Sequence, residues 1–156
     1  MSGTKKGTEA DGKAQADAER REFLVRLYAS LLDDDAGHGV SGMLRAALLD
    51  EPPEGPDLFR DLGAAQAFAF RVLPDFYVTS GLCYLSGHAS LGPDYNGPAG
   101  ERLFREWPVE KCDGGWHEDL HPDAGGIADV SHQCAAILRC VMKAVAFREG
   151  IEGIGD

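Results

Sequence analysis

The stretch from residue 127 to residue 150, IADVSHQCAAILRCVMKAVAFREG, carries the clearest structural signal in the chain. Apolar side chains recur there at steps of three and four residues, the spacing of one face of an α-helix. They are Ile127, Val130, Cys134, Ile137, Val141 and Val145. This stripe predicts a C-terminal helix that packs against other helices, and Gly150 is expected to end it.

Three earlier segments show the same periodicity, at residues 17–32, 40–49 and 58–73. The segment 75–86, DFYVTSGLCYLS, contains β-favouring residues but is short and follows a helix, so we interpret it as a fourth, kinked helix. The predicted fold class is therefore all-α, mostly helical, with four to five helices.

Residues 87–126 form a long irregular segment before the C-terminal helix, with eight glycines and four prolines. Its large aromatic residues argue against disorder, because disordered segments contain few of them. These aromatic residues are Tyr95, Phe104, Trp107 and Trp116. Two interpretations remain open: the rings fold back on the helices, or they anchor a subunit interface.

A chain of 156 residues fits a single domain. We predict a flexible polar tail over residues 1–16, one helical domain over 17–150 and a second tail over 151–156. The net charge of −11 argues against a nucleic-acid or anionic-membrane partner. No apolar run approaches the roughly 20 residues that span a bilayer, so no membrane span is expected. Without a secretory signal we expect a cytoplasmic protein with reduced cysteines, and export together with a partner is the alternative.

Residues 117–121, HEDLH, match the H-E-x-x-H pattern of zinc hydrolases. In that pattern two histidines one helical turn apart hold zinc, and Glu118 would be the base. The glycines before the motif and Pro122 after it disfavour the continuous helix that it requires. A structural ion held by Cys112, His117 and His121 is a second metal hypothesis. A small zinc-dependent hydrolase or a structural-metal protein is thus the alternative function, and no other catalytic residue is expected.

Four segments resemble the small subunits of FAD-dependent sorbitol- and glucose-type dehydrogenase complexes. They are EFLVRLYASLLDD (22–34), VSGMLRAALLD (40–50), FRVLPDFYVTSG (70–81) and KCDGGW (111–116). The resemblance covers about residues 22–122. The chain departs from that family in lacking a twin-arginine signal peptide, in the Cys-to-Trp spacing and in its long final helix.

This resemblance implies a non-catalytic accessory subunit that supports the folding, export or stability of a larger flavoprotein. FAD would then belong to the partner subunit, and this chain would carry no cofactor. Homo-oligomerisation through the C-terminal helix is a further expectation that is compatible with either function.

Overall fold

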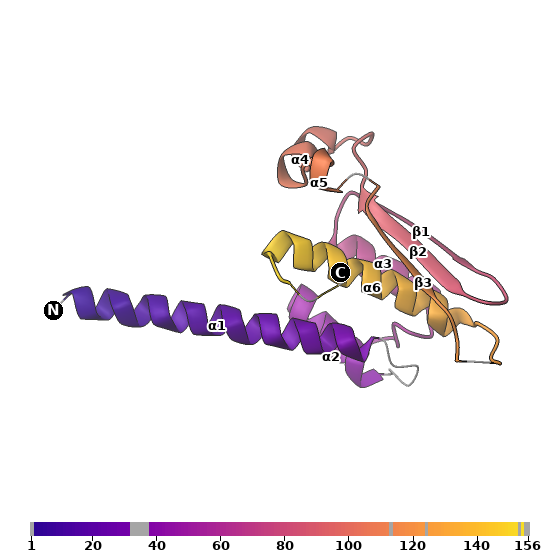
Figure 1. The fold of residues 1–156 in the computed structure, drawn as a ribbon, viewed down its shortest axis with the longest axis horizontal. Coiled ribbons are helices and arrows are strands. Elements are labelled where there is room, and N and C mark those ends of the chain that lie inside the picture. The colour runs from indigo at the N-terminus through magenta and orange to yellow at the C-terminus, as the bar shows by residue number, and fades with distance from the viewer. Residues whose placement is uncertain (1, 32–37, 113, 124, 153, 155–156) are drawn as a thin grey trace.

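Over the residues that it describes, the computed structural model combines six helices with a three-stranded antiparallel sheet (Figure 1), so the all-α prediction is wrong. The structure describes residues 2–31, 38–112, 114–123, 125–152 and 154. In chain order the elements are α1 (Ser2–Ser30), α2 (His38–Leu49), α3 (Leu62–Val72), β1 (Phe76–Leu82), β2 (Gly87–Pro93), α4 (Gly100–Glu106), α5 (Val109–Cys112), β3 (Trp116–Leu120) and α6 (Val130–Glu149).

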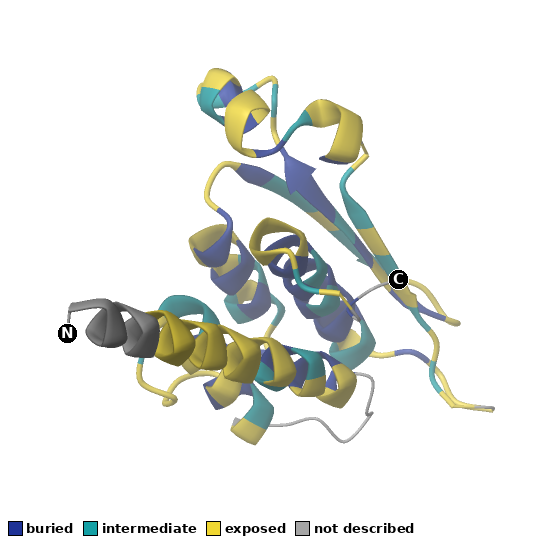
Figure 2. Ribbon diagram, turned by 60° about the vertical axis from the view of Figure 1, so that its left-hand side comes forward, coloured by how far each residue is buried: buried dark blue, intermediate teal, exposed yellow. Residues whose placement is uncertain are grey.

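The predicted C-terminal helix is present as α6, but Ile127 lies before it and is exposed, and the helix packs mainly on the sheet rather than on other helices. Asp129 caps its start by accepting a hydrogen bond from the backbone N–H of Ser131, and Gly150 ends it in a left-handed conformation with φ of 68°. Nearly every side chain between residues 133 and 146 is buried (Figure 2), which makes α6 the centre of the core. Its length and composition would also suit a membrane-crossing helix, but most of it lies inside the fold, as expected of a core helix.

Residues 75–86 do not form the predicted kinked helix. β1 and β2 instead form a hairpin in which Phe76 pairs with Pro93 and Leu82 pairs with Gly87. The turn closes where the N–H of Cys83 donates to the carbonyl of Ser86 at 2.8 Å. The β-branched and aromatic residues of β1 suit a half-buried strand. Its backbone groups form their hydrogen bonds with β2, whereas in a helix they would have bonded within the segment itself.

The segment 87–126, predicted as irregular, contains β2, α4, α5 and β3. Strand β3 pairs antiparallel with β2, so β2 is the central strand. The two short helices form a lobe at one end of the sheet, defined here as residues 94–112 (Figure 1). Inside the lobe the hydroxyl of Tyr95 donates to the carbonyl of Trp107 at 2.6 Å, which ties its two halves together.

Both predicted tails contain structure. Residues 2–16 form the first half of α1, which projects away from the rest of the molecule (Figure 1). The stretch 10–21 is exposed and contains four alanines and two arginines, residues with high intrinsic helix propensity. At the other end, Ile154 is buried and the N–H of Ile151 donates to the carbonyl of Ala146 at 2.8 Å.

We predict that Gly87→Ala destabilises the fold by about 1–3 kcal/mol, because overpacking a core forces backbone shifts of that cost. A Cβ atom at Gly87 would lie 2.2 Å from the backbone nitrogen of Gln133 on α6. Urea unfolding followed by circular dichroism measures the change. The control, Gly12→Ala, places a Cβ that meets nothing within 4 Å and should leave stability equal or higher. An unchanged midpoint for Gly87→Ala would contradict the packing described here.

Candidate functional site

The HEDLH motif lies on a strand. Residues 117–120 belong to β3 and His121 follows it, so successive side chains point to opposite faces of the sheet. Glu118 faces α6, whereas His117 and Asp119 lie on the uncovered face. Four residues of extended chain span about 13 Å, so the two histidines do not share one face of a helical turn. The helix that a zinc hydrolase builds from this motif is therefore not formed.

The structure does not bring the three predicted metal ligands together. The Nδ1 atom of His117 lies 2.6 Å from the Oγ of Ser90, and the Nδ1 atom of His121 lies 3.0 Å from the carbonyl oxygen of Leu85. Cys112 is buried in the lobe. Within the described residues, no group of three or more His, Cys, Asp or Glu side chains is placed to hold a metal ion.

Glu118, the base of the zinc hypothesis, is instead the centre of a buried ionic cluster. Its carboxylate is 8% exposed and lies 2.6 Å from the Nζ of Lys143 and 3.3 Å from the Nη1 of Arg139. The hydroxyl of Tyr28 donates to the same carboxylate at 3.3 Å, and the Arg139 guanidinium lies 5.4 Å from the centre of the Tyr28 ring. The cluster thus joins β3 to α6 and α1, and its two cations occupy both carboxylate oxygens.

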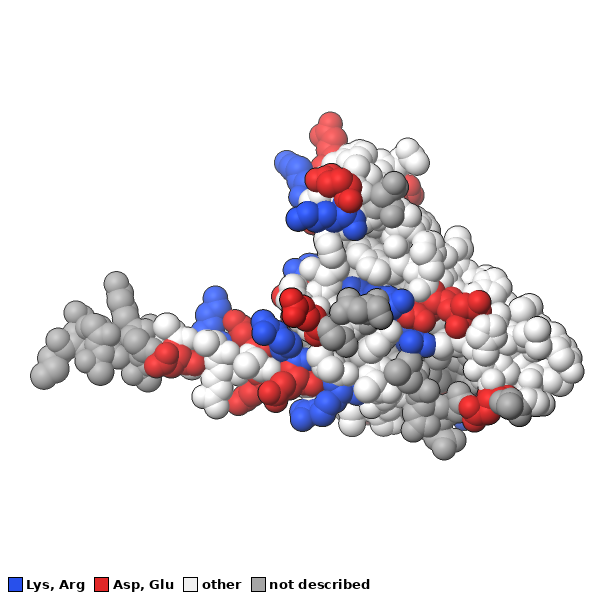
Figure 3. All heavy atoms as spheres, in the orientation of Figure 1, with Lys and Arg blue, Asp and Glu red and all other residues white. Residues whose placement is uncertain are grey.

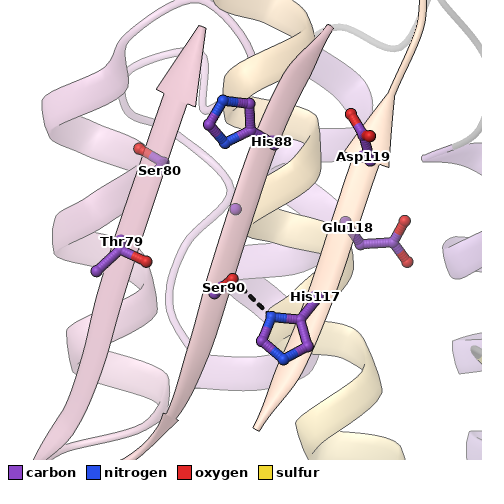
Figure 4. A pocket seen from close by; sticks show the side chains of 8 residues that line it. Thr79, Ser80, His88, Ser90, His117, Glu118 and Asp119 are labelled. Carbon is purple, nitrogen blue, oxygen red and sulfur yellow. Dashed lines mark hydrogen bonds between the residues drawn. The ribbon is translucent and has the colours of Figure 1, made fainter. Parts of the chain in front are cut away.

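The uncovered face of the sheet carries a shallow hollow of about 460 Å³. Figure 4 shows its polar side chains, which come from all three strands. The strand register places His88 opposite Asp119 and Ser90 opposite His117, and Thr79 extends the row onto β1. Two imidazoles and two hydroxyls can exchange hydrogen bonds and protons there, but the hollow is open to solvent. Its geometry suits a contact surface better than an enclosed reaction site.

Glycine fixes the position of one of these imidazoles. A Cβ atom at Gly81 would lie 2.3 Å from the Cε1 of His88, because the ring rests on the backbone of β1. The sequence reasoning missed this face. The alternation of polar and apolar residues in GHASLGP would have indicated it, had residues 87–93 been read as a strand.

The aromatic residues predicted as interface anchors divide into two groups. Trp107 is 4% exposed, and Trp116 is partly buried beside it with ring centroids 5.8 Å apart. Both contact Phe147 of α6, so these rings fold back on the core of the chain. Phe104 differs, because it is half exposed and stacks on Tyr95 with ring centroids 4.5 Å apart. The interface role of the set stays a prediction, and Phe104 is the member best exposed for it.

A second hollow, of about 310 Å³, lies where the lobe meets the start of β1. Its floor is apolar and its rim is charged. It is lined by Leu73, Pro74, Phe76, Trp107, Arg102, Glu106 and Arg148. Arg102 is held by Asp75 at 2.6 Å and by Glu106 at 2.7 Å. Arg148 has no ion-pair partner among the described residues, so its guanidinium group could pair with an anionic group of a ligand. We call this site the lobe hollow.

The four cysteines lie in two kinds of environment. Cys134, a member of the predicted apolar stripe, and Cys140 are fully buried, and burial raises the pKa of their thiols to about 11 and about 12. Burial also raises the pKa of Cys112. Cys83, by contrast, is exposed at the β1–β2 turn. The hydroxyl of Ser86 lies 3.3 Å from its sulfur and lowers the pKa of this thiol.

We predict that Glu118→Ala destabilises the protein by about 3–5 kcal/mol, because it leaves two partly buried cations without their carboxylate. Asp119→Ala, next to it on β3 but on the exposed face, should change stability by no more than about 0.5 kcal/mol. Chemical unfolding of both variants gives the comparison. Equal, small effects would mean that Glu118 does not face α6.

Alkylation should separate the cysteines. A lowered pKa raises the thiolate fraction at a given pH, and the thiolate is the reacting form. In native protein at neutral pH we expect iodoacetamide to modify Cys83 first and the other three only after unfolding, as read by peptide mass spectrometry. A Cys83→Ser variant should take up no label while folded. Rapid labelling of Cys134 or Cys140 in folded protein would contradict the packing of α6.

Comparison of the chain with protein-family models, with curated proteins and with solved structures found no match.

Proposed function

We propose that this chain is a non-catalytic interaction subunit of a larger assembly and that it binds its partner through the lobe hollow. The observation that carries the proposal is an apolar floor beside Arg148, which has no ion-pair partner among the described residues, in a chain whose net charge is −11. The floor includes Trp107 and Phe76, whose rings meet edge to face with centroids 4.9 Å apart. A preformed aromatic pocket with a cationic rim is a common anchor point for a partner side chain.

The chemistry of the lobe hollow indicates what the partner presents. An apolar side chain would fill the space above Leu73, Pro74 and Trp107, and burial of that surface would supply most of the affinity. A carboxylate next to that side chain would pair with Arg148. We therefore expect a partner segment that carries an apolar residue beside an acidic residue. Exposed Phe104, on the same lobe, would extend the contact.

The class of partner follows from the sequence resemblance to dehydrogenase small subunits. It supports a larger flavoprotein oxidoreductase as the partner, with FAD bound by that subunit. The two hollows described above also support a non-catalytic chain beside a catalytic flavoprotein, because neither hollow encloses a set of catalytic groups. Binding to nucleic acid or to anionic membranes is disfavoured by the excess of 26 acidic over 15 basic residues.

The zinc-hydrolase alternative is disfavoured by the backbone conformation of the HEDLH stretch. It requires His117, His121 and Glu118 on one face of a helix, and the structure places this stretch on β3 with Glu118 turned toward α6. Observations on the chain thus favour the interaction subunit.

Affinity purification from the cells that encode the chain tests the proposal. The tagged wild-type chain should recover a larger subunit in stoichiometric amount, and the complex should show flavin absorbance. Arg148→Glu reverses the free charge of the lobe hollow and should lower recovery about tenfold or more. Arg26→Glu makes the same change of charge on the exposed side of α1 and should leave recovery unchanged.

Two outcomes would overturn parts of the proposal. Equal recovery by wild type and Arg148→Glu would place the partner elsewhere on the molecule. Recovery of a partner that contains no flavin would reject the oxidoreductase assignment while retaining an interaction subunit.

A further inference from the structure

The β1–β2 hairpin is the uncharged part of a highly charged molecule. Residues 76–93 contain no Asp, Glu, Lys or Arg, although these residues make up 26% of the chain. Figure 3 shows charged side chains along α1 and on the lobe, whereas the side formed by the hairpin is largely free of them. Leu82, Tyr84 and Leu85 at its tip are between 46% and 67% exposed.

The outer edge of β1 has free hydrogen-bonding groups. In an antiparallel pair the backbone groups of alternate residues point toward the neighbouring strand. Cys83 bonds to Ser86 and Asp94 bonds to Asp75 across the hairpin, so the odd-numbered residues of β1 face β2. The backbone groups of Val78, Ser80 and Leu82 therefore point outward. In the part of the chain that the structure describes, β2 is the only strand that pairs with β1.

The opposite edge of the sheet is protected. The Nζ of Lys143 donates to the carbonyl of His117 at 3.1 Å, on the side of β3 that faces away from β2. Strand β3 also carries Glu118 and Asp119, and charged residues commonly prevent an edge from pairing with another chain. β1 has neither a charged residue nor a proline, so it lacks the features that normally block such pairing.

We propose that β1 pairs antiparallel with β1 of a second copy of the chain, which joins the two sheets into one of six strands. A two-fold axis beside Thr79 would pair Phe76 with Leu82 of the second copy and Val78 with Ser80 of the second copy. Val78, Ser80 and Leu82 direct their backbone groups outward, as a hydrogen-bonded ladder requires, whereas Phe76 offers only its carbonyl because its N–H donates to the carbonyl of Leu73 at 3.3 Å. The pairing would also cover Leu82, which is 46% exposed in the single chain.

Charge selects a second copy as the occupant. Two chains of net charge −11 repel over most of their surfaces, but the hairpin brings no like charges together. A two-fold interface must be complementary to itself, and a neutral strand edge with both donors and acceptors meets that condition. The contact uses the backbone of β1, whereas the proposed partner site uses side chains of the lobe hollow, so the inference does not depend on the proposed function.

Sedimentation velocity of the full chain over a range of concentrations tests the proposal, and we expect a monomer–dimer equilibrium. Thr79→Lys places two ammonium groups opposite each other at the axis and should raise the dimer Kd about tenfold or more. Thr79→Ser is the matched control and should leave the Kd unchanged. A protein that is monomeric at every concentration would overturn the inference.

Disulfide formation tests the register. In a Cys83→Ser background, the thiols introduced by Thr79→Cys would face each other across the axis, with Cβ atoms about 4.5–5.5 Å apart, and should cross-link under mild oxidation. Ser90→Cys, on the same face but one strand farther from the axis, separates the two thiols by about 14 Å and should not cross-link. A dimer that neither forms this cross-link nor weakens with Thr79→Lys uses another surface and would reject the proposal.

The two proposals can fail separately. Arg148→Glu should remain a dimer even where it loses the larger partner. A monomeric chain that still recovers a flavoprotein would overturn the β1 pairing alone.

Discussion

The close approach of α6 to β2 is the contact on which the rest of the structure depends. The sulfur of Cys140 lies 3.7 Å from the carbonyl oxygen of Ala89, and Gly87 crosses the backbone of α6 at Gln133 with no space for a Cβ atom. Gln133, Ala136 and Cys140 lie on one face of the helix, since they are spaced by three and four residues. Small side chains on both elements thus let the sheet lie directly on the helix.

This contact divides the side chains of the sheet into two sets. One set, with Leu91 and Trp116, faces α6, and α3 packs against another side of that helix. Because β3 also brings Glu118 to the buried side, the fold must supply cations there, and Arg139 and Lys143 of α6 do so. The opposite face of the sheet carries histidine and hydroxyl side chains. The inward position of Glu118 is therefore a structural requirement of the fold.

Helices α2, α3, α6 and the second half of α1 could be predicted because each carries its own evidence, whereas the short helices α4 and α5 were not predicted. The apolar spacing of α6 and of α3 repeats over several turns, so no knowledge of distant residues is needed. β1 and β2 are seven residues each, and β3 is formed by residues more than 30 positions after β1 in the chain. A short strand is stable only beside its partners, and the sequence of one strand alone does not identify them.

The candidate sites, like the fold, could be predicted only in part from the sequence. The aromatic residues of segment 87–126 were evident in the sequence, but the sequence could not show that Trp107 packs inside while Phe104 stays exposed. HEDLH was misleading because its three fixed residues carry no information on backbone conformation, and the strand turned Glu118 away from His117. Arg148 in the lobe hollow and the free edge of β1 arise only when segments far apart in the sequence meet, so neither could be inferred beforehand.

The central claim is that residues 116–120 form a strand on β2, with Glu118 directed to α6. Residue-resolved amide hydrogen exchange by NMR tests it most directly. The register predicts alternation: the amides of Trp116, Glu118 and Leu120 donate to β2 and should exchange slowly, whereas those of His117 and Asp119 point away from β2 and should exchange fast. Uninterrupted protection from residue 117 to residue 121, as in a helix, or uniformly fast exchange, as in a loop, would contradict it.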